Sequence, residues 1–251
     1  MYKLGLIGTP LTHSFSKKYF DDKFAKEKIN NFSYNLYDLN DINELDIICN
    51  QELVGLNVTQ PYKKTIINYL DELDLFANKT KSVNTVFINP ETKKKTGYNT
   101  DIIGFETLLN SMSLHEDIQA LILGSGGVSN TISHVLSKKK IKHLLVSRKP
   151  KYNMLSYQDL NNVISDFNLI INTTPVGQYP HINTRPIFPY HLISNQHLFI
   201  DLIYNPQKTM FLKTAEEQGA TIINGEQMFI HQAEASFTIW KKCLKKTQCF
   251  N

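Results

Sequence analysis

Two motifs in the sequence carry side chains that could perform proton chemistry. GLNVTQPYKK places Asn57, Thr59 and Lys63 directly after an apolar run that is typical of a buried strand. A lysine moves protons at neutral pH when burial or an ion partner tunes it, and Asp101 in GYNTD is a candidate partner. We expect both groups at the ends of elements that face a cleft between two domains. An ordinary polar surface loop is the alternative.

A glycine-rich loop, LILGSGGVSNTI, has the properties of a dinucleotide-binding site. Gly124, Ser125, Gly126 and Gly127 stand between a strand pattern and a helix pattern. Missing side chains there let the backbone approach a pyrophosphate, and the N–H groups of the helix N-terminus face its charge. Ser129 occupies the place of the third glycine in GxGxxG. A tight strand-to-helix turn is the alternative.

The strand pattern after this loop, HLLV, ends at a basic corner. NAD-binding units place an acidic residue here for the ribose 2′-hydroxyl, whereas NADP-binding units place a cation. This sequence has Ser147, Arg148 and Lys149, followed after Pro150 by Lys151. A 2′-phosphate would find several hydrogen-bond donors here, whereas the ribose 2′-hydroxyl of NAD would find no carboxylate. We therefore interpret the corner as part of an NADP site, with an ordinary basic surface turn as the alternative.

A third polar loop, NTTPVG, follows a later strand pattern. We expect Asn172, Thr173 and Thr174 to lie on the same sheet edge and to bind the ribose or nicotinamide part of the cofactor. Taken alone, the segment is only a turn.

Apolar runs that alternate with helical patterns predict an α/β fold in two blocks. In the first block we expect strands at YKLGLIG, NFSYNLYDL and LVGLNV, helices at SKKYFDDKFAKEKI, INELDIICNQE and TIINYLDELDLFANKT, and a hairpin at VNTVFINPETKKKTGYNT. The second block begins with a strand, the glycine loop, a helix and a second strand over QALILGSGGVSNTISHVLSKKKIKHLLVSR. We expect further strands in DFNLIINTTPVG, HLFIDLIY and TIIN. We expect a helix at MFLKTAEEQG and a long last helix at GEQMFIHQAEASFTIWKKC. The expected domains are 1–101, 102–225 and a C-terminal helix at 226–251 that packs back on the first block. Hinges are expected near Asp101 and Gly225.

Composition narrows the possible partners of this chain. The 251 residues are 41% hydrophobic with a net charge of +4, which fits a soluble globular protein and makes nucleic acid a weaker candidate than a small anionic ligand. We expect no signal peptide, no membrane span and a cytoplasmic location. Cys49, Cys243 and Cys249 have no zinc-site spacing, so we expect reduced thiols and no metal.

Together these motifs resemble the shikimate dehydrogenase family, in the family's order, from GTPLTHSFS to GEQMFIHQA. The resemblance implies an N-terminal α/β substrate domain, a Rossmann-type NADP-binding domain and a C-terminal helix that returns to the first domain. It also implies reduction of 3-dehydroshikimate to shikimate, on the route to aromatic amino acids, by a monomer or homodimer.

The resemblance assigns roles to individual residues. Lys63 and Asp101 match the catalytic lysine and its carboxylate partner. The substrate contacts that it implies are Ser14 and Ser16 for the carboxylate, Asn84 for a ring hydroxyl, and Asn57, Thr59, Tyr204 and Gln232 for the rest of the pocket. The implied cofactor contacts are Gly124, Ser125, Gly126, Gly127, Ser147, Arg148, Lys149, Asn172, Thr173, Thr174 and Gly225.

Each assignment has a structural alternative when it is considered singly. Ser14 and Ser16 could cap a helix, Asn84 could form a turn, Gln232 could face solvent and Tyr204 could fill a core. The family's Asn-Arg-Thr at the basic corner reads Ser147-Arg148-Lys149 here, so Lys149 or Lys151 would supply the neighbouring phosphate contacts. Two functional rivals remain, a quinate/shikimate dehydrogenase that uses NAD and a sensor that binds shikimate and NADP without turnover.

Overall fold

The computed structural model describes residues 1–12, 14–49 and 52–248, so Cys249 lies outside the described part of the chain. Contacts divide the chain into two compact units. One consists of Met1–Thr100 and Gln232–Asn251, and the other of Asp101–His231. The functional domain limits given above stay a prediction, because compactness alone does not define a functional domain.

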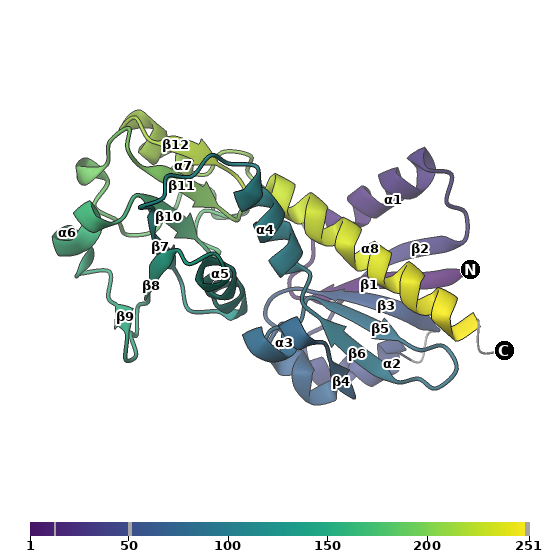
Figure 1. The fold of residues 1–251 in the computed structure, drawn as a ribbon. Helices are drawn as coiled ribbons and strands as arrows, with labels where there is room; N and C mark the ends of the chain where they lie inside the picture. Colours follow the sequence, from purple (N-terminus) through teal and green to yellow (C-terminus); the bar gives the residue numbers. More distant parts are fainter. Residues whose placement is uncertain (13, 50–51, 249–251) are drawn as a thin grey trace. The chain divides into compact units, whose positions relative to one another are not determined.

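The first unit is built on a mixed sheet (Figure 1). Its described strands are β1 (Tyr2–Gly8), β2 (Phe32–Asp38), β3 (Leu53–Val58), β4 (Glu72–Leu73), β5 (Thr85–Ile88) and β6 (Lys95–Tyr98), in the order β2-β1-β3-β5-β6-β4. β1 pairs in parallel with β2 and β3, whereas β5 is antiparallel to β3 and β6. The expected strands and the β5–β6 hairpin are therefore confirmed.

Apolar clusters cover both faces of this sheet. On one face, α1 (Ser16–Lys26) contributes Phe20 and Phe24, one helical turn apart, to a cluster with Phe237 and Trp240 of α8 (Glu226–Gln248). Figure 1 shows α8 running along the sheet beside α1, and the Lys23 ammonium lies 2.9 Å from the Glu234 carboxylate. The C-terminal helix thus returns to the first unit, as predicted.

Short helices lie against the second cluster, on the other face. The helix expected at 42–52 consists of η1 (Ile42–Glu44) and α2 (Leu45–Cys49), with positions 50 and 51 outside the described residues. The single helix expected at 65–80 is wrong. The chain forms η2 (Thr65–Tyr69), then β4, then α3 (Leu75–Thr80). Asp71 and Asp74 donate their N–H groups to β6, and the Asp74 side chain caps α3, so sheet pairing interrupts the helical pattern.

The second unit contains a parallel sheet with the order β12-β11-β10-β7-β8-β9. Its strands are β7 (Gln119–Leu123), β8 (Lys142–Val146), β9 (Met154–Leu155), β10 (Leu169–Asn172), β11 (Leu198–Asp201) and β12 (Thr221–Ile223). Its helical segments are α4 (Asp101–Asn110), α5 (Gly127–Lys138), α6 (Leu160–Val163), η3 (Ile164–Asp166), η4 (Tyr190–Leu192) and α7 (Met210–Glu217). Counted from β7, this order is 3-2-1-4-5-6, the doubly wound dinucleotide-binding arrangement. The predicted fold class is confirmed.

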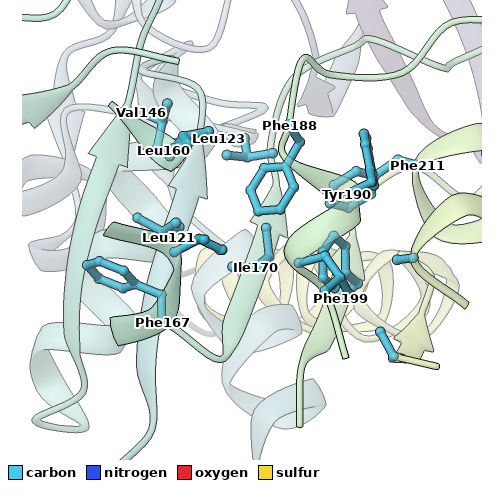
Figure 2. Packing of buried hydrophobic residues seen from close by; sticks show 14 of the residues in the cluster. Leu121, Leu123, Val146, Leu160, Phe167, Ile170, Phe188, Tyr190, Phe199 and Phe211 are labelled. Atoms are coloured by element: carbon cyan, nitrogen blue, oxygen red, sulfur yellow. The ribbon is translucent and has the colours of Figure 1, made fainter. Parts of the chain in front are cut away.

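The core of the second unit explains why its strands are almost continuously apolar. A parallel sheet is covered on both faces, and accordingly all four residues of β10 and four of the five residues of β7 are buried. Figure 2 shows Leu121, Ile170 and Phe199 on neighbouring strands, with Phe188 and Tyr190 packed beside them. The rings of Phe188 and Phe199 meet edge to face at 5.6 Å. This packing holds the strand ends from which the polar loops emerge.

Candidate active site

The loop after β3 carries Lys63 and is anchored at several points. Thr59 donates its N–H to the Ile7 carbonyl (2.9 Å), and Tyr62 donates to the Thr59 carbonyl (3.0 Å). Val83 donates to the carbonyl of Lys63 (2.8 Å). The backbone of Lys63 is therefore fixed beside the segment that leads into β5, and its side chain is half-buried.

Asn57 is the second-last residue of β3 and is almost fully buried. Its Nδ2 donates to the Asn84 carbonyl (3.2 Å) and lies 3.0 Å from the Ser236 hydroxyl, while its Oδ1 accepts from Tyr34 (2.8 Å). Most of its hydrogen-bonding capacity is used inside the first unit. Asn57 therefore ties β3 to the start of β5 and to α8.

The side chain of Asn84 bonds directly to a second predicted site residue, Gln232. It is 3% exposed and accepts the N–H of Thr100 at Oδ1 (2.7 Å). Its Nδ2 donates to the Thr100 hydroxyl (2.9 Å) and to Oε1 of Gln232 (3.2 Å). Asn57, Asn84 and Gln232, which are far apart in sequence, are thus brought into one hydrogen-bonded cluster.

Sequence reasoning missed three members of this cluster, Thr85, Thr100 and Ser236. All are buried, and the Ser236 hydroxyl lies 2.7 Å from that of Thr85 and 3.0 Å from that of Thr100. A signal existed for each. Thr85 and Thr100 stand beside Asn84 and Asp101 in the motifs already identified, and Ser236 follows Gln232 by one helical turn.

Ser14 and Ser16 lie at the start of α1. Ser14 Oγ accepts the N–H of Ser16 (3.3 Å), so the capping interpretation is satisfied in part. Both side chains remain half-buried, and the first N–H groups of an eleven-residue helix lie beside them. The position suits an anion as well as a cap.

Three further predicted residues belong to the second unit. Asp101 is 4% exposed and occupies the first turn of α4, where the helix dipole favours a carboxylate. The ring of Tyr204, after β11, lies 4.7 Å from that of Phe229, and burial raises the pKa of its hydroxyl to about 12. A Cβ on Gly225 would collide with the Leu202 backbone, so close packing explains this glycine. The pairing of Asp101 with Lys63 stays a prediction.

The glycine loop follows β7 and opens α5. Gly124 has φ of +120°, and a Cβ there would approach Thr173 Oγ1 at 2.6 Å, so both backbone and space require glycine. A Cβ on Gly126 would meet nothing within 4 Å, which leaves the backbone open to an approaching group. The loop thus has a packed side at Gly124 and an open side at Gly126.

Ser129, which stands in place of the third glycine, holds the loop through its hydroxyl. Its buried Oγ accepts the Gly126 N–H (3.0 Å) and lies 2.7 Å from the Thr173 hydroxyl. Thr173 in turn donates to the Leu123 carbonyl (2.7 Å). The hydroxyl therefore ties the glycine loop to the end of β10, across the point where the strand order reverses.

The buried carboxylate of Asp201 holds the NTTPVG loop through hydrogen bonds. Asn172 Nδ2 donates to Asp201 Oδ1 (3.0 Å), and Asn172 Oδ1 accepts from Thr174 N (3.0 Å). The Thr209 hydroxyl donates to Asp201 Oδ2 (2.6 Å). Burial raises the pKa of Asp201 to about 7, although these donors oppose the rise. Asn172 thus serves to hold the loop in shape.

The basic corner lies next to the glycine loop. The hydroxyls of Ser125 and Ser147 are 3.2 Å apart, and Ser147 Oγ also accepts the Lys149 N–H (3.3 Å). Arg148 and Lys149 are exposed. Burial raises the pKa of the Tyr157 hydroxyl, and the charge of Arg148 offsets part of that rise, so Arg148 lies near Tyr157. The hydrogen bonds of Ser147 thus fix the backbone of this corner, while the side chains of Arg148 and Lys149 are exposed to solvent.

These residues fit a dinucleotide with a 2′-phosphate. The open backbone at Gly126 and the N-terminus of α5 suit a pyrophosphate. Arg148 and Lys149 extend from the end of β8, where the ribose binds in this fold, and no carboxylate occupies positions 147 to 151. The fit therefore includes the feature that separates NADP from NAD.

Within the described residues, no cluster of three or more His, Cys, Asp or Glu side chains could hold a metal ion. Among the described helices, none combines the length and the apolar composition needed to cross a membrane.

Comparisons with known proteins agree with this geometry. The model of the shikimate dehydrogenase substrate binding domain matches residues 6–86. A protein of Methanococcus maripaludis named shikimate dehydrogenase (NADP(+)) is 39% identical, over 94% of this chain and 91% of its own. A crystal structure of shikimate dehydrogenase from Aquifex aeolicus has a TM-score of 0.85 at 31% identity, over 97% of this chain and 93% of that chain. Another shikimate dehydrogenase, in complex with NADP+, has a TM-score of 0.83 at 31% identity, over 96% of this chain and 90% of that chain. This chain belongs to the shikimate dehydrogenase family.

Proposed function

We propose that this protein catalyses the reversible, NADP-dependent reduction of 3-dehydroshikimate to shikimate, the reaction that supplies shikimate for aromatic amino acid synthesis. One observation carries the proposal. A buried polar cluster in the first unit and a glycine loop with a cationic corner in the second occur together in one chain of this family. The first suits a polyhydroxylated acid and the second suits NADP.

In the first unit, we assign substrate binding to groups of complementary chemistry. Ser14 and Ser16, at the N-terminus of α1, bind the substrate carboxylate. Thr59 and Gln232 offer polar groups to the ring oxygens. Asn57 holds the backbone of Asn84, whose side chain contacts Gln232. From the second unit, Tyr204 contributes a hydroxyl, whose pKa burial raises to about 12.

For proton transfer, we assign Lys63 and Asp101. NADPH, when bound, supplies the hydride for the ring carbonyl. Lys63 donates a proton to the oxygen that becomes the alkoxide, and Asp101 orients Lys63. In the reverse direction, Lys63 accepts the proton from the substrate hydroxyl. Support for this assignment comes from the fixed backbone of Lys63 and the burial of Asp101.

At the cofactor site, we assign the 2′-phosphate to Arg148, with Lys149 or Lys151 as a second cation. Gly124, Ser125, Gly126 and Gly127 form the loop under the pyrophosphate. We assign Thr173 and Thr174 to the nicotinamide side of the cofactor. Asn172 holds their loop, and Gly225 packs against the backbone of Leu202. The absence of a carboxylate at positions 147 to 151 disfavours the NAD-dependent quinate/shikimate dehydrogenase.

A pair of lysine variants tests catalysis. Lys63→Ala should lower kcat by on the order of 100-fold or more while changing the KM for shikimate less. Lys64→Ala, which removes an exposed lysine from the next position, should leave both constants near wild type. An unchanged kcat in Lys63→Ala would remove Lys63 from the proton path. A wild-type protein that binds both ligands without hydride transfer would support the sensor instead.

A pair of cation variants tests cofactor choice. Arg148→Ala should raise the KM for NADP by on the order of 10- to 100-fold and the KM for NAD far less. Lys142→Ala, at the other end of β8, removes an exposed charge and should alter neither. Equal effects of Arg148→Ala on the two cofactors would mean that the phosphate is held elsewhere.

We further propose that the protein acts in the cytoplasm, as a monomer or homodimer. Cys49 and Cys243 are free thiols, which fits a reducing compartment.

A further inference from the structure

The carboxyl group of Asp201, which takes no part in the proposed proton transfer, bonds to two different elements. Asp201 is the last residue of β11 and is fully buried. Its Oδ1 accepts from Asn172 Nδ2 (3.0 Å) and from the N–H of Ile203 (3.1 Å), and Asn172 is its register partner at the end of β10. Its Oδ2 accepts from the hydroxyl of Thr209 (2.6 Å), the N-terminal cap of α7. One oxygen thus bonds toward the NTTPVG loop and the other toward α7.

Asn172 carries the contact with Asp201 into the loop. Its Oδ1 accepts both the N–H (3.0 Å) and the hydroxyl (2.7 Å) of Thr174. Because the N–H of Thr174 can only donate, the other end of the amide must be Nδ2, which needs an acceptor. Asp201 Oδ1 supplies that acceptor at 3.0 Å, whereas the Val176 carbonyl lies farther away, at 3.5 Å. Asn172 is fully buried, so bulk water cannot replace Asp201 as its partner.

The loop that is held in this way lies against the glycine loop. A Cβ on Gly124 would approach Thr173 Oγ1 at 2.6 Å and Thr174 Cγ2 at 3.2 Å. In the sheet, β10 is next to β7 on one side, and β8, which ends at the basic corner, is next to β7 on the other. In this fold a dinucleotide binds across the point where the strand order reverses, with its two halves on opposite sides. A change in the NTTPVG loop should therefore affect the nicotinamide half of NADP and spare the adenosine half.

We propose that Asp201 is a positioning residue for the cofactor. Through Asn172, its Oδ1 holds the NTTPVG loop in the shape that binds the nicotinamide half of NADP, while its Oδ2 supports the N-terminus of α7. The inference rests on the proposed function, because it takes NADP as the cofactor and this loop as a contact of its nicotinamide half. It gives the two oxygens of one carboxylate separate effects, one on cofactor affinity and one on the stability of the second unit.

Calorimetric binding of NADP and of a fragment of NADP tests the effect on affinity. The fragment, adenosine 2′,5′-bisphosphate, contains the adenine, the ribose and the 2′-phosphate and lacks the nicotinamide half. Asp201→Leu keeps the branching of the side chain and removes both acceptors. It should raise the Kd for NADP by on the order of 10-fold or more and leave the Kd for the fragment within about twofold of wild type. Arg148→Ala should weaken both ligands, since both carry the 2′-phosphate.

Two further changes establish the route of this effect. Asp201→Ala removes the same oxygens without added bulk and should give the same pattern, so the test does not depend on the folding of one variant. Asn172→Ala breaks the bond from the side of the loop. In that background, Asp201→Leu should raise the Kd for NADP by no more than about twofold, because the effect of Asp201 passes through the Asn172 amide.

Two conservative variants separate affinity from stability. Asp201→Asn keeps an oxygen toward Asn172 and Ile203 and should bind NADP within about threefold of wild type. Thr209→Val keeps the branched shape and removes both the donor to Oδ2 and the cap of α7. It should lower the melting temperature while the Kd values for NADP and for the fragment stay within about threefold of wild type.

The proposal is overturned if Asp201→Leu binds NADP as tightly as wild type, if it weakens the fragment as much as NADP, or if Thr209→Val weakens NADP to the same extent. The second of these outcomes would indicate a general loosening of the second unit. A folded wild type that does not bind NADP would contradict the proposed function and this role together. Because calorimetry needs no turnover, a wild type that binds NADP without hydride transfer would contradict the proposed function alone.

Discussion

Replacing Asp201 with asparagine should remove a pH dependence from the stability of the second unit. Burial raises the pKa of this carboxyl from 3.8 to about 7, so in the folded protein it keeps its proton in a range where the unfolded chain has lost it. The folded state then binds more protons than the unfolded state between about pH 4 and pH 7. The free energy of unfolding therefore falls as pH rises through this window.

The size of the effect follows from the shift. A difference of about three pKa units corresponds to about 4 kcal/mol, with a slope of at most about 1.4 kcal/mol per pH unit. Asp201→Asn is neutral at every pH and mimics the protonated acid. Its oxygen can keep accepting from Asn172 and from the N–H of Ile203, while its amide nitrogen faces Thr209, whose hydroxyl can turn to accept.

Urea unfolding followed by circular dichroism, at several values from pH 4.5 to pH 8, measures this difference. We expect wild type to lose stability relative to Asp201→Asn as pH rises, and the variant to be the more stable protein at pH 8. Burial lowers the pKa of His197 and gives wild type an opposite trend, which the comparison of the two proteins cancels. Asp166→Asn, at an exposed position, should leave the wild-type profile intact. Parallel profiles for wild type and Asp201→Asn would refute the reasoning.

Three further substitutions test the packing. The Ser82 hydroxyl is fully buried without a hydrogen-bond partner. Ser82→Ala should therefore raise the free energy of unfolding, measured in urea titrations, by about 1 kcal/mol. A loss of stability would mean that the hydroxyl is paired. Gly124→Ala should cost about 1–3 kcal/mol and weaken NADP binding, because of the positive φ and the approach to Thr173; unchanged calorimetric binding would contradict this. Trp240→Phe removes the donor to the Val86 carbonyl (2.9 Å) and should cost about 1–3 kcal/mol by urea unfolding, whereas no change would show that the bond is dispensable.

The strand and loop patterns of the sequence predicted the fold well because each depends on local chemistry. β7, the glycine loop and α5 were found from an apolar run, three glycines and a helical pattern. The region 65–80 was mispredicted, since the pairing of β4 with β6 is a tertiary contact that no local pattern reveals.

The candidate site was predictable in its residues and less so in their roles. Asn57, Asn84 and Gln232 were identified from separate motifs, but only the fold shows that they bond to one another. Ser129 and Asp201 were not assigned a role, because a serine in place of a glycine and an acid within an apolar strand gain meaning only from what surrounds them.

The most direct test of the proposed activity is the initial rate of nicotinamide reduction, followed by absorbance, for the purified protein with shikimate and either NADP or NAD. We predict turnover with NADP and a kcat/KM that exceeds the value for NAD by at least about tenfold, because Arg148 and its neighbours find a phosphate only in NADP. Preference for NAD would contradict the assignment of the basic corner. Silence with both cofactors, in a protein shown to be folded, would contradict the proposed reaction.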